Sequence, residues 1–83
     1  MSRLSATEVH ELYAWRERAI LDLSTRSAIH LEDLPDERGL LCLVADKLWN
    51  LCDARARAFL MGHPHHFVRS FATSASTRFP VLA

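Results

Sequence analysis

The longest apolar-rich stretch of the chain runs from Gly39 to Gly62 and dominates its hydrophobic pattern. Its apolar positions recur at steps of three, four and seven residues, which is the spacing of one face of a helix. These positions are Leu41, Val44, Leu48, Cys52 and Phe59. Further apolar residues flank this face, so more than half of the circumference must be covered by neighbours. We therefore predict a central helix, over about residues 35–61, in a small all-α bundle.

The N-terminal segment predicts a second long helix, over about residues 5–27 and antiparallel to the central one. Ser5 and Glu8 have the spacing of a capping box, which marks a helix start. An apolar stripe at helical spacing follows, and it is interrupted by one arginine, Arg16. We expect the Arg16 guanidinium to reach water, a carboxylate or a partner. The apolar stripe consists of Val9, Leu12, Tyr13, Ile20 and Leu23.

A third, shorter helix is predicted over about residues 64–75. Gly62 is typical of a helix end, and Pro64 is tolerated in the first turn of the next helix. The serine and threonine residues at 73–77 weaken a helix interior, so the helix is expected to end there. We predict that residues 76–83 form a flexible or docking tail.

The composition favours self-association of one helical domain that spans residues 1–83. A chain of 83 residues forms only a marginal core, yet 49% of its residues are hydrophobic. Dimerisation is a common way to cover such a surplus, and we expect a homodimer that completes the bundle. A heterologous protein partner is the second expectation. The candidate interaction residues are Trp15, Leu21, Leu43, Trp49, Met61, Phe67 and Phe71.

The charge pattern does not favour nucleic-acid binding, because ten basic and ten acidic residues give a net charge of zero without a basic run. Charged residues interrupt the only long apolar stretch, so no membrane span is predicted. No signal peptide is recognised at the N-terminus, and the expected location is the cytoplasm. Cys42 and Cys52 lie about 15 Å apart on the predicted helix, which excludes a disulfide between them there.

Candidate chemistry is sparse. His63, His65 and His66 form a cluster that contains metal-ligating groups, but they lack the spacing of a closed zinc site. We expect a solvated corner between two helices there, with no metal and no cofactor. Serine, histidine and aspartate residues occur without a short motif that places them together, and a glycine-rich phosphate loop is absent from the sequence. We therefore expect that the protein is not an enzyme.

Two segments are similar in part to the toxin-binding domain of certain bacterial antitoxins. They are residues 44–48 and residues 58–65, where Phe59-Leu60 stands in place of the aromatic-leucine pair of that family. The Gly-x-x-Pro turn that follows this pair in the family is absent here. The resemblance implies a helical region that binds a toxin protein.

The sequence therefore predicts a small, bacterial, non-enzymatic regulatory or adaptor protein that binds another protein through a helical face. Inhibition of a transcription regulator or of an enzyme is a compatible mode of action. Two alternatives stay open. One is an antitoxin-like component that binds a toxin or acts as a DNA-binding repressor, and the other is a metal-binding protein that uses the cluster at residues 63–66.

Overall fold

The computed structural model describes residues 4–78, and these residues form an all-α structure. Four α-helices and two short 3₁₀ turns follow one another in this part of the chain. In chain order they are α1 (Ala6–Ser24), η1 (Leu31–Asp33), α2 (Arg38–Lys47), η2 (Trp49–Leu51), α3 (Ala54–Met61) and α4 (His66–Arg78). The all-α prediction is confirmed.

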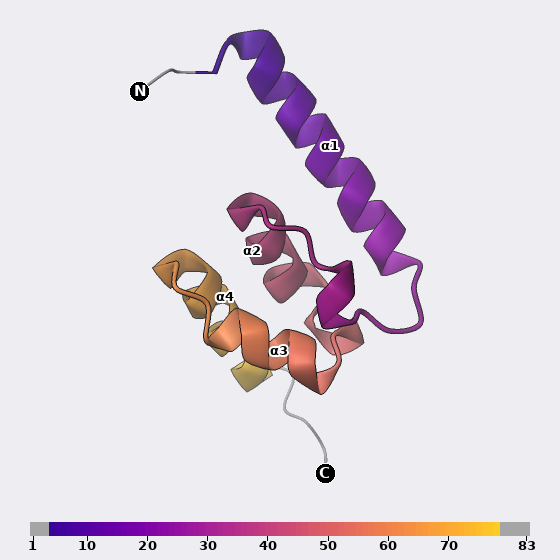
Figure 1. Ribbon diagram of the computed structural model, residues 1–83, viewed down its shortest axis with the longest axis vertical. Helices are drawn as coiled ribbons and strands as arrows, with labels where there is room; N and C mark the ends of the chain where they lie inside the picture. The colour runs from indigo at the N-terminus through magenta and orange to yellow at the C-terminus, as the bar shows by residue number, and fades with distance from the viewer. Residues whose placement is uncertain (1–3, 79–83) are drawn as a thin grey trace.

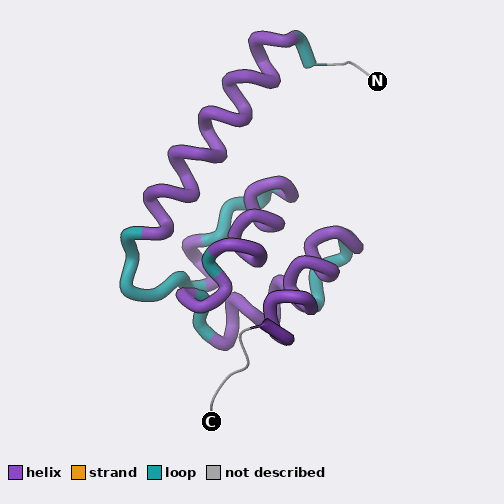
Figure 2. Tube along the Cα trace, turned by 180° about the vertical axis from the view of Figure 1, so that it is seen from behind, coloured by secondary structure: helices purple, strands orange, loops and turns teal. Residues whose placement is uncertain are grey.

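Helix α2 occupies the centre of the structure, with α1 along one side and α4 along the other (Figure 2). Its buried side chains and those of α3 and α4 form one hydrophobic core. Three small residues on α3 and α4 are fully buried, which lets these helices approach each other closely. These residues are Ala56, Ala72 and Ala75.

The predicted central helix over residues 35–61 is interrupted, so its predicted length is wrong. Helix α2 ends at Lys47, and α3 begins at Ala54 after the turn η2. The carboxylate of Asp53 accepts a hydrogen bond from the Ala56 amide at 2.8 Å and caps the new helix. Aspartate favours such a cap over a helix interior, because its side chain competes for backbone amides.

The connector after α1 is joined to this interruption by backbone hydrogen bonds. The amide of Ile29 donates to the Leu51 carbonyl at 2.8 Å, and the Asp53 amide donates to the Ile29 carbonyl at 2.9 Å. These bonds form an isolated parallel bridge between Ile29 and Cys52. The Ile29 side chain is fully buried, so it closes the core at the point where the predicted helix breaks.

Helix α1 begins as predicted and ends earlier than predicted. Ser5 and Glu8 form the expected capping box. The helix stops at Ser24 instead of about residue 27, and Thr25 takes the C-cap position, where its amide donates to the carbonyls of Asp22 and Leu23.

The predicted antiparallel arrangement of the two long helices is wrong. Residues 25–37 run back along the molecule before α2 begins, so α1 and α2 point in the same direction (Figure 1). Arg16, in the middle of α1, therefore lies beside Gly39 at the start of α2. As a consequence, the first half of α1, residues 6–15, extends beyond the start of α2 (Figure 1).

Helix α4 is longer than predicted. It begins at His66 and continues to Arg78, through the serine and threonine residues that were expected to end it. The hydroxyl groups of Ser76 and Thr77 donate to the Thr73 carbonyl, which satisfies them without leaving the helical conformation. Residues 76–78 of the predicted tail thus belong to α4, and residues 79–83 lie outside the described part of the chain.

The interruption changes which face of the second segment is buried. Leu41, Val44, Leu48 and Cys52 are buried as predicted, but Phe59 is 39% exposed. The turn at η2 shifts the helical register, so that Leu60, which was placed on the flank, becomes fully buried. The prediction for Phe59 is therefore wrong, and its neighbour takes the core position.

This shift predicts that substitutions at two adjacent residues lower the free energy of unfolding by different amounts. Leu60→Ala should lower the free energy of unfolding by about 2–5 kcal/mol, because it leaves a cavity in the core. Phe59→Ala should lower it by less than Leu60→Ala does, because the Phe59 side chain is 39% exposed and lies outside the core cluster. Urea denaturation followed by circular dichroism measures both. A larger loss for Phe59→Ala would favour the uninterrupted helix.

Candidate functional site

An apolar groove of about 550 Å³ lies along α2. Helix α2 forms its floor, α1 forms one wall, and Phe71 of α4 forms the other wall. We call this surface the α2 groove. Its lining residues are Tyr13, Arg16, Glu17, Ile20, Leu21, Gly39, Cys42, Leu43, Asp46, Lys47 and Phe71.

The wall from α1 presents three side chains at intervals of four residues. Tyr13, Glu17 and Leu21 have the spacing that places side chains on one side of a helix. Tyr13 is 62% exposed and Leu21 is 60% exposed, although both are large and apolar for most of their area. This wall therefore leaves an apolar ridge in contact with solvent.

The floor combines apolar side chains with a charged lower end. Leu43 packs against the core, and Cys42 is half-buried beside it. Burial raises the pKa of the Cys42 thiol above its ordinary value, so the thiol stays protonated near neutral pH. At the end of α2, Asp46 lies 3.2 Å from Arg78 and 3.7 Å from Lys47.

Arg16 crosses the groove near the start of α2. Its guanidinium forms an ion pair with Glu37, with bonds of 3.1 Å from its Nε to both carboxylate oxygens. Glu37 also accepts a hydrogen bond from the Leu40 amide at 2.6 Å and so caps α2. Burial acts to raise the pKa of Glu37, but the hydrogen bonds from Arg16 and Leu40 outweigh it and the net pKa is lowered. The expected carboxylate partner of Arg16 is thus Glu37.

Gly39 makes this ion pair possible. A Cβ atom at this position would lie 2.3–2.6 Å from the guanidinium atoms of Arg16. Any larger residue therefore forces the Arg16 side chain to leave its place over the first turn of α2. Beyond Arg16, a second hollow of about 320 Å³ adjoins the α2 groove and extends towards His65 and Phe67 at the start of α4.

The structure brings together some of the predicted interaction residues. Leu21, Leu43 and Phe71 line the α2 groove, and Phe67 lines the adjoining hollow. Trp15 is 37% exposed on the part of α1 that extends beyond α2.

Two predicted interaction residues lie elsewhere. Met61 is exposed at the end of α3, and it borders a separate shallow hollow along α4. Trp49 is only 2% exposed, so the structure places it in the core and not on the surface. It lies in the turn η2, where the changed register points it into the core, and the Arg57 guanidinium covers its ring at 5.4 Å.

Tyr13 was predicted as part of the core stripe of the first helix, but it lines the groove. The spacing of Tyr13, Glu17 and Leu21 was a usable signal, since two large apolar residues and one carboxylate share a helical side. Cys42 and Ile20 were likewise read as core residues only. They pack partly against the core and line the groove at the same time.

The histidine cluster forms the corner between α3 and α4. The Nδ1 atom of His63 accepts a hydrogen bond from the His65 amide at 3.0 Å, and the Nδ1 atom of His65 accepts one from the Phe67 amide at 3.3 Å. The rings of His65 and His66 stack at 5.1 Å. Two of the three imidazoles therefore use one ring nitrogen to satisfy backbone amides at the start of α4. Over residues 4–78, no three histidine, cysteine, aspartate or glutamate side chains gather as a metal ion would require.

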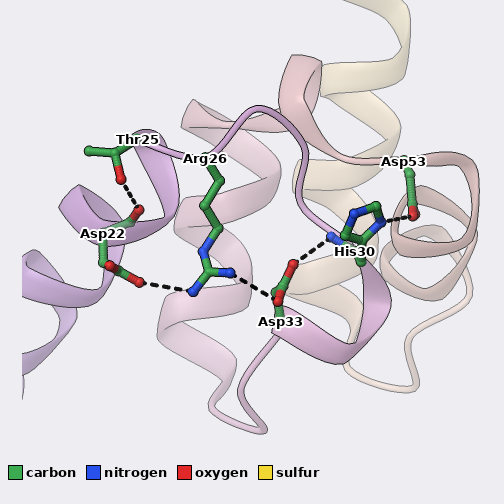
Figure 3. A network of polar contacts seen from close by, with 6 residues as sticks. All are labelled: Asp22, Thr25, Arg26, His30, Asp33 and Asp53. Atoms are coloured by element: carbon green, nitrogen blue, oxygen red, sulfur yellow. Dashed lines mark hydrogen bonds and ion pairs between the residues drawn. The ribbon is translucent and has the colours of Figure 1, made fainter.

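A second polar cluster fixes the connector between α1 and α2 (Figure 3). Arg26 lies 3.2 Å from Asp22 and 3.2 Å from Asp33. Asp33 accepts a hydrogen bond from the His30 amide at 2.9 Å, and the His30 Nδ1 lies 2.7 Å from Asp53. The hydrogen bond to Asp53 raises the pKa of His30 above its ordinary value. The pKa of Asp53 is lowered, chiefly by the Ala56 amide and then by His30. This cluster joins α1, the connector and α3.

None of the helices in the described residues is both long enough and apolar enough to cross a membrane. Comparisons of the chain with protein-family models, with curated proteins and with solved structures found no match.

The ion pair between His30 and Asp53 predicts a pH-dependent stability. Because the folded-state pKa of His30 is raised, the contribution of its charge is complete below the ordinary pKa and is lost as pH rises through the raised value. His30→Gln keeps a hydrogen-bond donor and removes the charge. Its destabilisation relative to wild type should therefore be larger at pH 6 than at pH 9, as measured by urea denaturation.

His10→Gln serves as the matched control, since His10 is exposed on α1 away from this cluster. Its effect on stability should be the same at both pH values. A destabilisation by His30→Gln that does not change between pH 6 and pH 9 would exclude the charged pair.

Proposed function

We propose that this protein is a non-enzymatic regulatory or adaptor protein that binds another protein through the α2 groove. The observation that carries this proposal is the exposed apolar lining of the groove, with Tyr13, Leu21 and Phe71 on its walls. Exposed apolar surface that is gathered in one concave region is typical of a binding site for a protein or a ligand.

The shape of the groove favours a helix as the bound element. It has a helical floor with a wall on each side, and a helix laid in it would have three helical neighbours. Recognition of this kind uses apolar side chains of the bound helix at positions i, i+3 or i+4, and i+7. The proposed partner therefore presents an amphipathic helix, and covering that helix would inhibit whatever activity depends on it.

A transcription regulator or an enzyme that exposes such a helix is a suitable target. The antitoxin-like alternative is a special case, in which the bound protein is a toxin. Both share the same interface, so one experiment on the groove addresses them together.

Site-specific photo-crosslinking tests the proposal. A photoreactive amino acid at position 21 should crosslink to an amphipathic helical segment of a partner in cells of the source organism, and mass spectrometry identifies that segment. The same group at position 59, which is exposed on α3 away from the groove, is the control. Crosslinks that occur equally at both positions would contradict a groove-specific interaction.

Substitutions then test the strength of the contact. Leu21→Gln should weaken binding of the identified partner about tenfold or more, because it removes one apolar side chain from the interface. Phe59→Gln should leave the affinity unchanged. Both positions are exposed, so neither change should unfold the protein, and circular dichroism verifies this.

A further inference from the structure

Helix α1 carries an apolar stripe along its whole length, but only its second half packs against the core. Ala19, Ile20 and Leu23 pack against the core beside α2. Val9 and Leu12 continue the same side of the helix at steps of three and four residues; they are half-buried, and neither belongs to the core cluster or packs against it. The first half of α1, residues 6–15, extends past the start of α2 (Figure 1), and its Tyr13 and Trp15 side chains are exposed.

The molecule therefore has a surplus half-helix and a groove that accepts a helix, and the two have matching lengths. Residues 6–15 span about 14 Å, and the groove floor from Gly39 to Lys47 spans about 12 Å, at the rise of an α-helix. The half-helix cannot reach its own groove, because α1 is straight and its second half already forms a wall. A second copy of the chain can supply it.

We infer that the α2 groove of each molecule receives the first half of α1 from a second copy. The two copies are related by a two-fold axis that passes near residues 14 and 15, and their α1 helices run antiparallel. Each interface is then made twice, as a two-fold dimer requires. This inference rests on the proposed function only in that the same groove serves both occupants.

The register follows from the point at which α1 leaves the bundle. Arg16 lies beside Gly39, so in the antiparallel pair Val9 falls opposite Ile20 and over Leu43 of the second copy. Leu12 falls near Gly39 and Cys42 on the floor. Trp15 falls at the level of Phe67 on α4. The apolar residues in the first half of α1 thus meet apolar residues of the groove.

The charges agree with this arrangement. Residues 6–15 contain two carboxylates and no lysine or arginine. The positive end of the α1 dipole would lie near Asp46 at the lower end of the groove. The antiparallel pair therefore brings a positive helix end close to a carboxylate in each copy.

The dimer also affects how a partner protein binds. A partner helix that enters the groove must displace residues 6–15 of the second copy, so partner binding and dimerisation compete. The apparent affinity of the partner then falls as the protein concentration rises. A partner that bound the intact dimer without dissociating it would occupy another surface.

Sedimentation equilibrium tests the dimer on the full chain. Wild type should show a concentration-dependent mass between 9.5 kDa and twice that value. Leu12→Gln should weaken the dimer about a hundredfold or more, because the change is present twice in a two-fold dimer. Arg18→Gln, on the outer side of α1, is the matched control and should leave the dimer intact. Glutamine and leucine have similar helix propensities, so α1 stays formed.

Thiol crosslinking tests the register. Val9→Cys should give a covalent dimer with a short bismaleimide, which joins position 9 to Cys42 of the second copy. The double variant Val9→Cys/Cys42→Ser should not form this covalent dimer. Within one chain these positions are separated by about 15 Å along the helix axes. Thr7→Cys, on the outer side of α1, should not crosslink.

A protein that remains a monomer at every concentration would overturn this inference, whereas groove-dependent crosslinking to a partner would still support the proposed function. A dimer that Leu12→Gln leaves intact would place self-association on another surface.

Discussion

The backbone bridge from Ile29 to Leu51 and Asp53 determines how the rest of the chain is arranged. It holds the connector against the interruption between α2 and α3, where backbone groups would otherwise lack partners inside the structure. The buried Ile29 side chain fills the corner that the interruption opens. Because the connector is tied there, α2 must begin on the far side of the molecule and run beside α1 in the same direction. The α2 groove exists because of that parallel arrangement.

The sequence predicted the helical class and several local features correctly, and the reasons are local. The capping box at Ser5 and Glu8 and the core positions Leu41 and Val44 depend on residues close together in the chain. The break after Lys47 could not be predicted in the same way. Apolar spacing continues through residues 48–53, and the tertiary contact with Ile29, together with the Asp53 cap, makes the turn more favourable than an uninterrupted helix.

The candidate site was predictable in part for the same reason. Leu21 was recognised because it lies off the apolar stripe of its helix, and Phe71 because it lies on the apolar face of the predicted third helix; both features are visible in the sequence. Trp49 was misplaced because a single turn of 3₁₀ helix rotated it into the core. Tyr13 was misplaced because its assignment to the core assumed that α2 covers the whole of α1, whereas α2 begins beside Arg16.

Helix α1 packs mainly against α2, so it is expected to be less stable than the three helices that share the core. Residues 29–78 keep their own core when α1 moves away, because that core consists almost entirely of α2, α3, α4 and Ile29. Opening α1 therefore costs less free energy than unfolding the whole chain. Amide hydrogen exchange should therefore be faster along the first turns of α1 than along α2. We expect that α1, which forms one wall of the groove, opens more readily than the three helices that share the core.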